Sequence, residues 1–325
     1  MPSRHDHFPR HDRERCFRTR AAADALETGW RAADVSPQGL VATIDALRDA
    51  PPAVAMDRLL PWLRDIGWLW ARLESALALL EIDIFARPPL RPIGGGERIA
   101  GLILAECGPV RLSLQLHRVE QGGAASTAAV FTPGAAVIRV LASGGVMLHR
   151  HHVALSEAEA TGLFSAASAA LCHNAPPRPL AQDEILQLDT AREAFSLTDA
   201  KGDVVLLELA VQPPSSLPIR SYDIASGRLA HVSASRRDSS FRQIALTLLR
   251  SFGRTDAAPL FVEATHDADF ATRWSALREL VALDPAAARA RVEAMAASDP
   301  HPEIRRAATA TLALYAPKEA DPCPA

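Results

Sequence analysis

The sequence predicts an α+β protein in three parts: a helical N-terminal region, a β-rich middle domain of the sandwich or barrel type, and a C-terminal α-solenoid of paired helices. Three observations support this fold class. Apolar residues recur with a helical period up to about residue 85, and with the two-residue period of strands after about residue 95. Beyond residue 236, three segments of similar sequence follow one another, 31 and 32 residues apart.

The composition is that of an ordinary globular protein. Of the 325 residues, 48% are hydrophobic and 22% are charged, and the formal net charge is −3. This charge balance gives no electrostatic reason to expect nucleic acid or an anionic membrane as the partner. Four scattered cysteines without CxxC spacing fit neither a disulfide framework nor a zinc ribbon. The charged N-terminus lacks the apolar core of a signal peptide, so we expect a cytoplasmic location.

The N-terminal part is predicted to be a tail followed by helices. Residues 1–20 are polar and have no apolar periodicity, which predicts a disordered tail. Residues 21–90 are expected to be helical. Their most hydrophobic run, DIGWLWARLESALALLEIDIF, carries Arg72 and Glu74 near its middle, where a bilayer would penalise both charges. The run is therefore predicted to be a buried helix rather than a membrane span.

Residues 95–235 are predicted to form the β-rich domain, with one inserted helix. In RLSLQLHR, residues 111–118, leucines alternate with polar residues, which is the pattern of a strand with one buried face. Further strand-like stretches are RIAGLILAE, AAVFTP, AAVIRVL, GVMLHRHHV, EILQLD, DVVLLELAVQ, LPIRSYD and RLAHVSA. The inserted helix, SEAEATGLFSAASAALC, is predicted to begin at a capping box that Ser156 forms with Glu159.

Residues 236–316 are predicted to form helical repeats, followed by a tail at 317–325. The segments DSSFRQIALTLL, DFATRWSALREL and DPHPEIRRAATATL align on Arg242, Arg273 and Arg305, and several of their alanines and leucines then coincide. Between them lie the second helices, AAPLFVEATH and PAAARARVEAMAAS. Alanines let neighbouring helices approach, and one pair cannot bury its own apolar stripe, so the pairs are predicted to stack.

The last of these segments, DPHPEIRRAATATLALY, resembles a HEAT repeat through its Asp299-Pro300 turn and its ridge of Ala308 and Leu312. The resemblance covers about 80 residues and implies a scaffold that recognises another protein or peptide. The arginines expected to contact the partner are Arg242, Arg273, Arg305 and Arg306. The alternative is that this short array only caps the β-rich domain.

The stretch VMLHRHHV is a candidate metal site. On a strand, His149 and His151 lie on one side, about 6.6 to 7 Å apart, so both imidazoles can approach one ion. This His-x-His resembles the start of a cupin metal site. A cupin continues with a glutamate on its barrel strands, whereas the next acids here, Glu157 and Glu159, fall in the first turn of the predicted helix. The remaining candidate ligands are His117, Cys172, His173 and His231, a donor set that suits iron or zinc. The alternative is a polar strand end at the surface.

The predicted function is a non-catalytic scaffold or accessory subunit that binds a protein or peptide through its repeats, with no cofactor indicated by the sequence. The alternative is a metal-dependent, cupin-like enzyme with oxidative chemistry at His149 and His151. A third hypothesis is nucleic-acid binding by the array. Residues 228–316 contain twelve arginines and ten acids, an excess too small to indicate DNA binding. The sequence contains no GxSxG elbow, phosphate-binding loop, HExxH motif or dinucleotide fingerprint.

Overall fold

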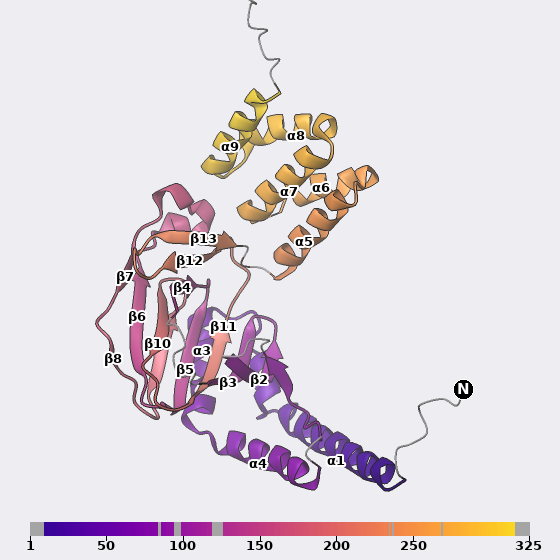
Figure 1. The fold of residues 1–325 in the computed structure, drawn as a ribbon, viewed down its shortest axis with the longest axis vertical. Coiled ribbons are helices and arrows are strands. Elements are labelled where there is room, and N and C mark those ends of the chain that lie inside the picture. The colour runs from indigo at the N-terminus through magenta and orange to yellow at the C-terminus, as the bar shows by residue number, and fades with distance from the viewer. Residues whose placement is uncertain are drawn as a thin grey trace, which may run out of the picture.

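The protein has helices at both ends and sheets between them, as predicted. The computed structural model describes residues 10–83, 86–93, 99–118, 126–233, 235, 237–267 and 269–315. In Figure 1, the N-terminal helices lie against a large sheet, smaller sheets follow, and a stack of helices forms the C-terminal end. None of the helices in these described ranges is long and apolar enough to cross a membrane.

Four helices precede the sheets, and the second and third of them pack on one face of the largest sheet. The four helices are α1 (Arg10–Asp34), α2 (Leu40–Asp45), α3 (Pro52–Arg64) and α4 (Gly67–Ile82). Leucines of α2, α3 and α4 share a core with leucines of the large sheet, for example Leu59 with Leu207 and Leu209. We call this helix-covered side the outer face of the large sheet. The predicted buried helix is α4, in which Arg72 lies at the contact with α1.

Helix α1 overturns part of the prediction for the N-terminus. Residues 10–20 are helical, so the expected disordered tail is wrong there, and residues 1–9 lie outside the described residues. One charge of this segment is paired across the fold, because Arg15 lies 3.7 Å from the buried Asp83, which follows α4. At the other end of α1, Asp34 pairs with Arg72 of α4. Contacts distant in sequence therefore stabilise a segment whose own composition is polar.

The middle of the chain forms three antiparallel sheets. The large sheet has the order β1 (Arg91–Ile93), β2 (Ile99–Cys107), β3 (Val110–His117), β11 (Val204–Val211), β5 (Ala135–Ala142), β9 (Ile185–Asp189). The second sheet consists of β10 (Glu193–Thr198), β6 (Met147–Val153), β7 (Cys172–Asn174) and β8 (Arg178–Pro179). The third consists of β13 (Leu229–Ser233), β12 (Ile219–Asp223) and β4 (Ala128–Phe131). The alternating patterns predicted most of these strands but not β1, β7, β8 or β10.

The second sheet covers the other side of the large sheet, which we call its inner face. Leu148 of β6 packs in one core with Val140 of β5 and Leu206 of β11. Both faces of β11 are therefore covered, because Leu207 and Leu209 face the helices while Leu206 faces the second sheet. Among the polar residues of the inner face, Ser113 is buried, whereas Gln115 and Glu208 are partly exposed.

The inserted helix is much shorter than predicted. The capping box is present: Glu159 accepts a hydrogen bond from Ser156 N at 2.9 Å, and Glu159 N donates to Ser156 Oγ at 3.3 Å. The helical turn nevertheless ends at Leu163, and only a 3-10 turn at Ala166–Ser168 follows. Gly162 has a φ of 115°, which an α-helix cannot accommodate, and this bend directs Phe164 into the interior.

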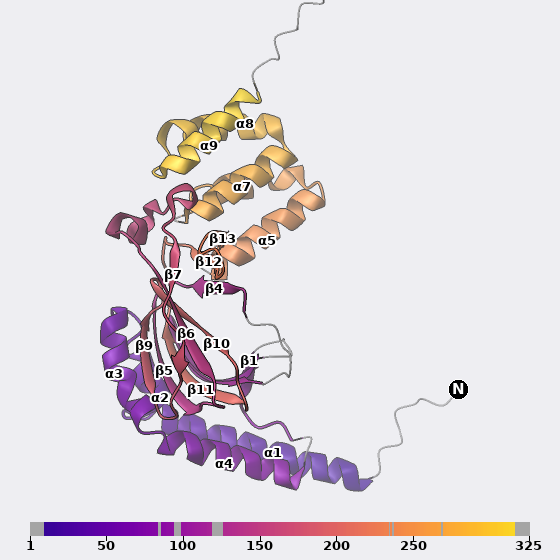
Figure 2. The same ribbon diagram turned by 60° about the vertical axis from the view of Figure 1, so that its left-hand side comes forward.

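The C-terminal helices form the predicted stack of pairs. They are α5 (Arg237–Ser251), α6 (Ala258–Ala264), α7 (Phe270–Leu283), α8 (Pro285–Ser298) and α9 (Pro302–Ala313), with a 3-10 turn at Thr255–Ala257. Figure 2 shows α5, α7 and α9 stacked in that order. The aligned Ala276, Leu280 and Ala308 are all buried in the shared core. The predicted tail at 317–325 lies outside the described residues.

The last repeat contacts the β-rich region directly. His301 Nε2 lies 2.8 Å from the carbonyl oxygen of Phe164, so the imidazole donates this hydrogen bond. Ser165 donates a second hydrogen bond to Glu303 in the first turn of α9. Buried His301 also stacks on Phe270, with ring centroids 4.1 Å apart. We call this group of contacts the clasp.

Candidate functional site

The aligned arginines hold the helical array together. Arg273 donates to both carboxylate oxygens of Asp299, at 3.0 and 2.9 Å, and also to the carbonyl oxygen of Asp267. Both members of the ion pair are buried. Arg242 pairs in the same way with the next turn, because its Nη1 lies 2.8 Å from Asp267 Oδ2. The predicted role of Arg273 as a partner contact is therefore replaced by a structural one, as its side chain lies inside the array.

Arg305 and Arg306 lie at the far end of the array. Arg305 donates to the carbonyl oxygens of Asp299 and Pro300, at 2.5 and 3.2 Å, which repeats the backbone contact of Arg273. Arg306 is largely exposed, and its nearest acid, Glu303, is 4.0 Å away. Of the four predicted partner-binding arginines, only Arg306 is thus presented mainly to solvent.

An apolar stripe lies on the exposed side of α5. Phe241, Ile244 and Leu248 follow one another at the spacing of a single helical face, and Phe252 continues the line just after the helix. Each of these side chains is more than half exposed, and Phe241 reaches 73%. We call these four residues the α5 stripe. Contiguous apolar surface of this kind marks interaction sites on soluble proteins.

The repeat alignment shows what normally covers such a position. The residues equivalent to Phe241 are Thr272 in α7 and Ile304 in α9, and both are buried. Thr272 faces the preceding helix, because Gln243 of α5 donates to its hydroxyl at 3.3 Å. Ile304 belongs to the core of the array. The α5 stripe therefore occupies the side of the helix that, in the later repeats, packs against the preceding repeat.

The opposite end of the array is polar. Leu246 of α5 and Leu277 of α7 face the following helix and are buried, whereas the equivalent residue of α9 is the exposed Thr309. Trp274 packs against the core, and its equivalent in α9 is Arg306. Terminal repeats of a solenoid need a polar outer face, and α9 has one while α5 does not.

The two predicted metal ligands are used in hydrogen bonds instead. His151 is only 2% exposed, with Nδ1 2.7 Å from Asn174 Oδ1 and Nε2 2.9 Å from Ser196 Oγ. Asn174 donates its amide to Ile224 O, so its oxygen faces the imidazole and His151 Nδ1 is the donor. His151 Nε2 then accepts from the Ser196 hydroxyl. Neither nitrogen of His151 retains a lone pair for a metal in this arrangement.

His149 and the other candidate ligands do not complete a site in this structure. His149 Nε2 lies 2.8 Å from Thr198 Oγ1. Both histidines lie on the side of β6 opposite to Leu148, so they point away from the core between the large sheet and the second sheet. The strand β7 brings Cys172 and His173 beside β6, but Cys172 is buried in an apolar cluster and His173 is exposed. Within the described residues, no three His, Cys, Asp or Glu side chains are arranged to hold a metal ion.

The other two candidates lie elsewhere. His117 ends β3 on the large sheet, where burial lowers its pKa, and His231 is exposed on β13. Neither strand pairs with β6. Iron or zinc binding at His149 and His151 therefore gains no support from the geometry.

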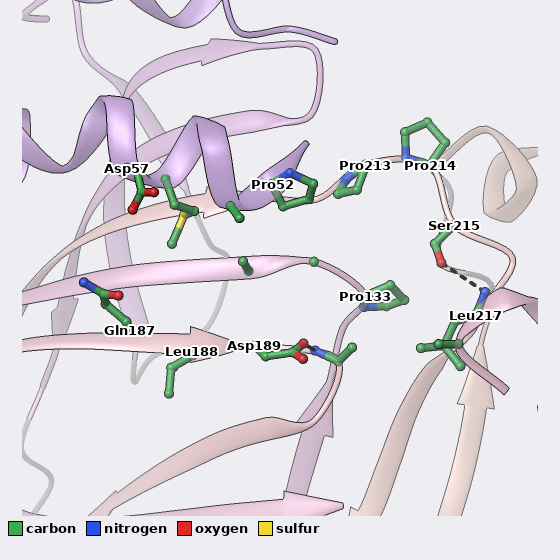
Figure 3. A pocket seen from close by; sticks show the side chains of 16 residues that line it. Pro52, Asp57, Pro133, Gln187, Leu188, Asp189, Pro213, Pro214, Ser215 and Leu217 are labelled. Carbon is green, nitrogen blue, oxygen red and sulfur yellow. Dashed lines mark hydrogen bonds between the residues drawn. The ribbon is translucent and has the colours of Figure 1, made fainter. Parts of the chain in front are cut away.

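A hollow with a volume of about 610 Å³ lies at one edge of the sheets. Figure 3 shows prolines at its rim, from α3, from the turn before β5 and from the segment after β11. Its few polar groups serve local turns: Asp189 accepts from Ala191 N and pairs with Arg192, and Ser215 accepts from Leu217 N. The hollow therefore offers apolar surface but no converging catalytic groups.

Residues 229–313 match the family of HEAT repeats. The match begins in β13 and ends in α9, so it covers the array and supports the resemblance noted in the sequence. No curated protein matches the chain.

Solved structures resemble parts of the chain only weakly. HutD from Pseudomonas fluorescens SBW25 is 16% identical, with 39% of this chain and 58% of that chain aligned and a TM-score of 0.25. AerE from Microcystis aeruginosa is 10% identical, with 38% and 45% aligned and a TM-score of 0.25. A cupin superfamily protein from Desulfitobacterium hafniense DCB-2 is 12% identical, with 37% and 83% aligned and a TM-score of 0.23. The chain spans about half the length of the first two. Superpositions this poor assign neither fold nor function.

The α5 stripe was missed in the sequence, although the aligned repeats contain its signal. At the position of Leu248, α7 has Glu279 and α9 has Thr311, and at the position of Ile244 they have Ser275 and Ala307. The first repeat is thus more apolar than the others on the side that would face a preceding helix. Comparing the repeats column by column, rather than by their shared residues, identifies it.

Proposed function

We propose that this chain is a non-catalytic, protein-binding scaffold or accessory subunit, and that its HEAT-like array binds a helix of the partner on the α5 stripe. The exposed stripe at a stacking position is the observation that carries the proposal. The match to HEAT repeats supports it, because such arrays commonly bind other proteins. A cytoplasmic location remains our expectation.

The occupant proposed for the stripe is an amphipathic helix that lies as an additional layer beneath α5. The first two repeats already use this geometry, since α7 lies on α5. On α7, Glu279 pairs with Arg250 of the preceding helix. The equivalent residue on α5 is Leu248, so the partner helix needs an apolar face and no matching charge. Leucine, isoleucine, methionine or phenylalanine at positions i, i+3 or i+4, and i+7 would fit.

The test is site-specific photocross-linking in the full-length chain, expressed in its native host. A photoreactive residue replaces Ile244 in one variant and Arg306 in a matched control at the other end of the array. The expected result is a single adduct from position 244, with the cross-linked peptide in a partner helix that has an apolar face, and no such adduct from position 306. An adduct of the chain with itself at position 244 would identify a second copy as the occupant and overturn the proposal of a separate partner.

A second pair of variants tests the arginine hypothesis at the same time. Phe241→Ser with Leu248→Glu introduces residue types that α7 carries at or near these positions, and should abolish the adduct while leaving the melting temperature unchanged. Arg305→Ala with Arg306→Ala should leave the adduct intact. The opposite pattern, with loss only in the arginine variant, would refute binding on α5 and restore the arginines as the partner site.

A further inference from the structure

A small polar cavity lies on the inner face of the large sheet, apart from the array and from the histidines. Its volume is about 180 Å³, and it lies where β2, β3 and β11 run alongside one another, near the turn at Gly108 and Pro109. The polar side chains that line it are Glu106, Arg111, Ser113, Gln115, Glu208 and Gln212. Such a concentration is unusual on a sheet face whose neighbouring positions form an apolar core.

Glu208 is the most unusual member of this cluster. Its register partners are Ser113 on β3 and Ile138 on β5, and the next residue on its face of β11 is the buried Leu206. Gln115 donates a hydrogen bond to its carboxylate. Burial raises the pKa of Glu208, against smaller lowering effects of Gln115 and of the charge on Arg111. Among the described residues, its hydrogen-bond donor is thus a neutral amide, not a cation.

The end of the cavity near Gly108 and Pro109 carries a surplus of positive charge. Arg111 donates to Glu106 Oε1 from Nε and Nη2, at 2.8 and 2.5 Å, and Arg91 pairs with the other oxygen of the same carboxylate. Burial would raise the pKa of Glu106, but the hydrogen bonds of the two guanidinium groups outweigh it and lower the pKa. Two cations therefore share one ionised carboxylate.

We propose that this cavity binds a small zwitterion of amino-acid size, with its ammonium group on Glu208 and its carboxylate on Arg111, while Arg91 keeps Glu106 paired. Such a ligand pairs both lining groups that the protein leaves without a full counter-charge. An anion alone would leave Glu208 without a cation, and a cation alone would meet Arg111. The volume equals that of about six water molecules at roughly 30 Å³ each, which limits the ligand to a few non-hydrogen atoms.

The same arrangement makes binding depend on pH. Glu208 must be ionised to hold an ammonium group, so a ligand that binds below its pKa displaces a proton from it. Affinity should therefore increase as pH rises towards the pKa of Glu208 and level off above it. A carboxylic acid without an amine would lack this increase.

The test is calorimetric titration of the full-length chain with glycine, β-alanine and 4-aminobutyrate, whose charges are increasingly far apart. Butyrate and butylamine are the matched ligands that keep one charge each. At least one zwitterion should bind ten-fold or more tightly than both of them. Absence of binding by all three zwitterions, or equal binding by butyrate, would refute the proposal.

Variants assign the two ends of the ligand. Glu208→Gln retains a side chain that can pair with Gln115, so it should fold normally while losing ten-fold or more in zwitterion affinity and the pH dependence. Arg111→Gln should lose affinity and keep the pH dependence. Glu157→Gln, an exposed acid on the turn after β6, is the control and should bind as the wild type does. Unchanged binding by folded Glu208→Gln would overturn the assignment.

Discussion

Two buried arginines, Arg273 in the helical array and Arg220 in the β-rich region, have opposite surroundings. In the array, Arg273 meets Asp299 through two hydrogen bonds and a backbone carbonyl through a third. In the β-rich region, Arg220 is 0% exposed, yet it donates to Ala191 O and has the Tyr222 hydroxyl as a further polar neighbour, and no carboxylate among the described residues forms a salt bridge with it. Glu208 likewise has an amide as its donor. Both regions contain buried polar atoms without a hydrogen-bond partner among the described residues, for example Asp269 Oδ2 in the array. The difference lies in the ion pairs: Arg273 has the carboxylate of Asp299, whereas Arg220 and Glu208 have no salt-bridge partner among the described residues.

Whether a buried charge has all of its partners indicates whether its role is structural or functional. A buried charge with a full set of partners contributes to architecture, because removing one partner leaves the other unpaired. A buried charge with an incomplete set costs free energy in the empty protein, and a ligand or water can supply what is missing. By this criterion, Arg273 has a structural role, and Glu208 is a candidate for a binding role.

The largest expected effect separates the two buried arginines. Arg273→Met should destabilise the array by about 3–5 kcal/mol, because Asp299 would remain buried without its cation. Arg220→Met should be neutral or stabilising by about 1 kcal/mol, since burial already lowers the pKa of Arg220 and the methionine can pack between Phe131 and Phe164. Native-state hydrogen exchange, read separately for each region, measures both. A large loss for Arg220→Met would mean that its guanidinium has partners, such as water, that make it structural.

Substitutions in the histidine network should have an intermediate effect on stability, because the side chains of this cluster are hydrogen-bonded to one another. His151→Ala should cost about 1–3 kcal/mol by leaving Asn174 and Ser196 without their partner. His149→Ala should cost less, as it breaks one hydrogen bond. Thermal melting with and without Zn²⁺ or Fe²⁺ checks both. An increase in the melting temperature of the wild type that both variants lack would support the metal site instead.

The pH dependence of stability sharpens the contrast further. The pKa of Glu208 is raised in the folded protein, so its contribution is fully present below the unfolded value of about 4.3 and is lost as pH rises through the folded pKa. Glu208→Gln removes this titration. Its stability relative to the wild type should therefore increase with pH above about 4.3, by denaturant unfolding at several pH values. A constant difference between the two would show that Glu208 is not desolvated.

The smallest effects are expected at the polar end of the array. Arg306→Ala should change stability by less than about 0.5 kcal/mol, because its side chain is mostly exposed. Arg305→Ala should cost about 1 kcal/mol through the lost hydrogen bonds to the turn carbonyls. Melting temperatures of the two variants compare them. Equal losses would indicate that α9 is not the solvent-exposed cap of the array.

The sequence could predict elements whose signal is local. The period of the leucines in residues 111–118, the capping box at Ser156 and the spacing of the three arginines each require only neighbouring residues or a repeat. The short strands β1, β7 and β8 have no such pattern, since two or three residues show no period. The first part of α1, residues 10–20, was missed for a related reason, because Asp83, the partner of its Arg15, lies far along the chain.

The site was harder to predict, because it depends on which residues are covered. The alternation in β3 showed that Ser113 and Gln115 share a face, but not that Glu208 of β11 lies beside them on that face. Glu208 was visible as a lone acid in the apolar stretch DVVLLELAVQ. Its neighbours across the strands decide whether such an acid is solvated or buried, and these depend on the strand order.

The clasp has a mechanical consequence. Because Phe164 and Ser165 hold the start of α9 while the chain itself joins β13 to α5, the array is attached to the sheets at both of its ends. An array held at one point could rotate about it, whereas this array, held at two points, keeps a fixed orientation relative to the sheets. A partner helix docked on α5 would then be presented in one fixed direction relative to the sheets. Removing the contacts of the clasp would leave the array joined to the sheets only through the connection to α5, so the array could rotate while both binding surfaces stayed intact.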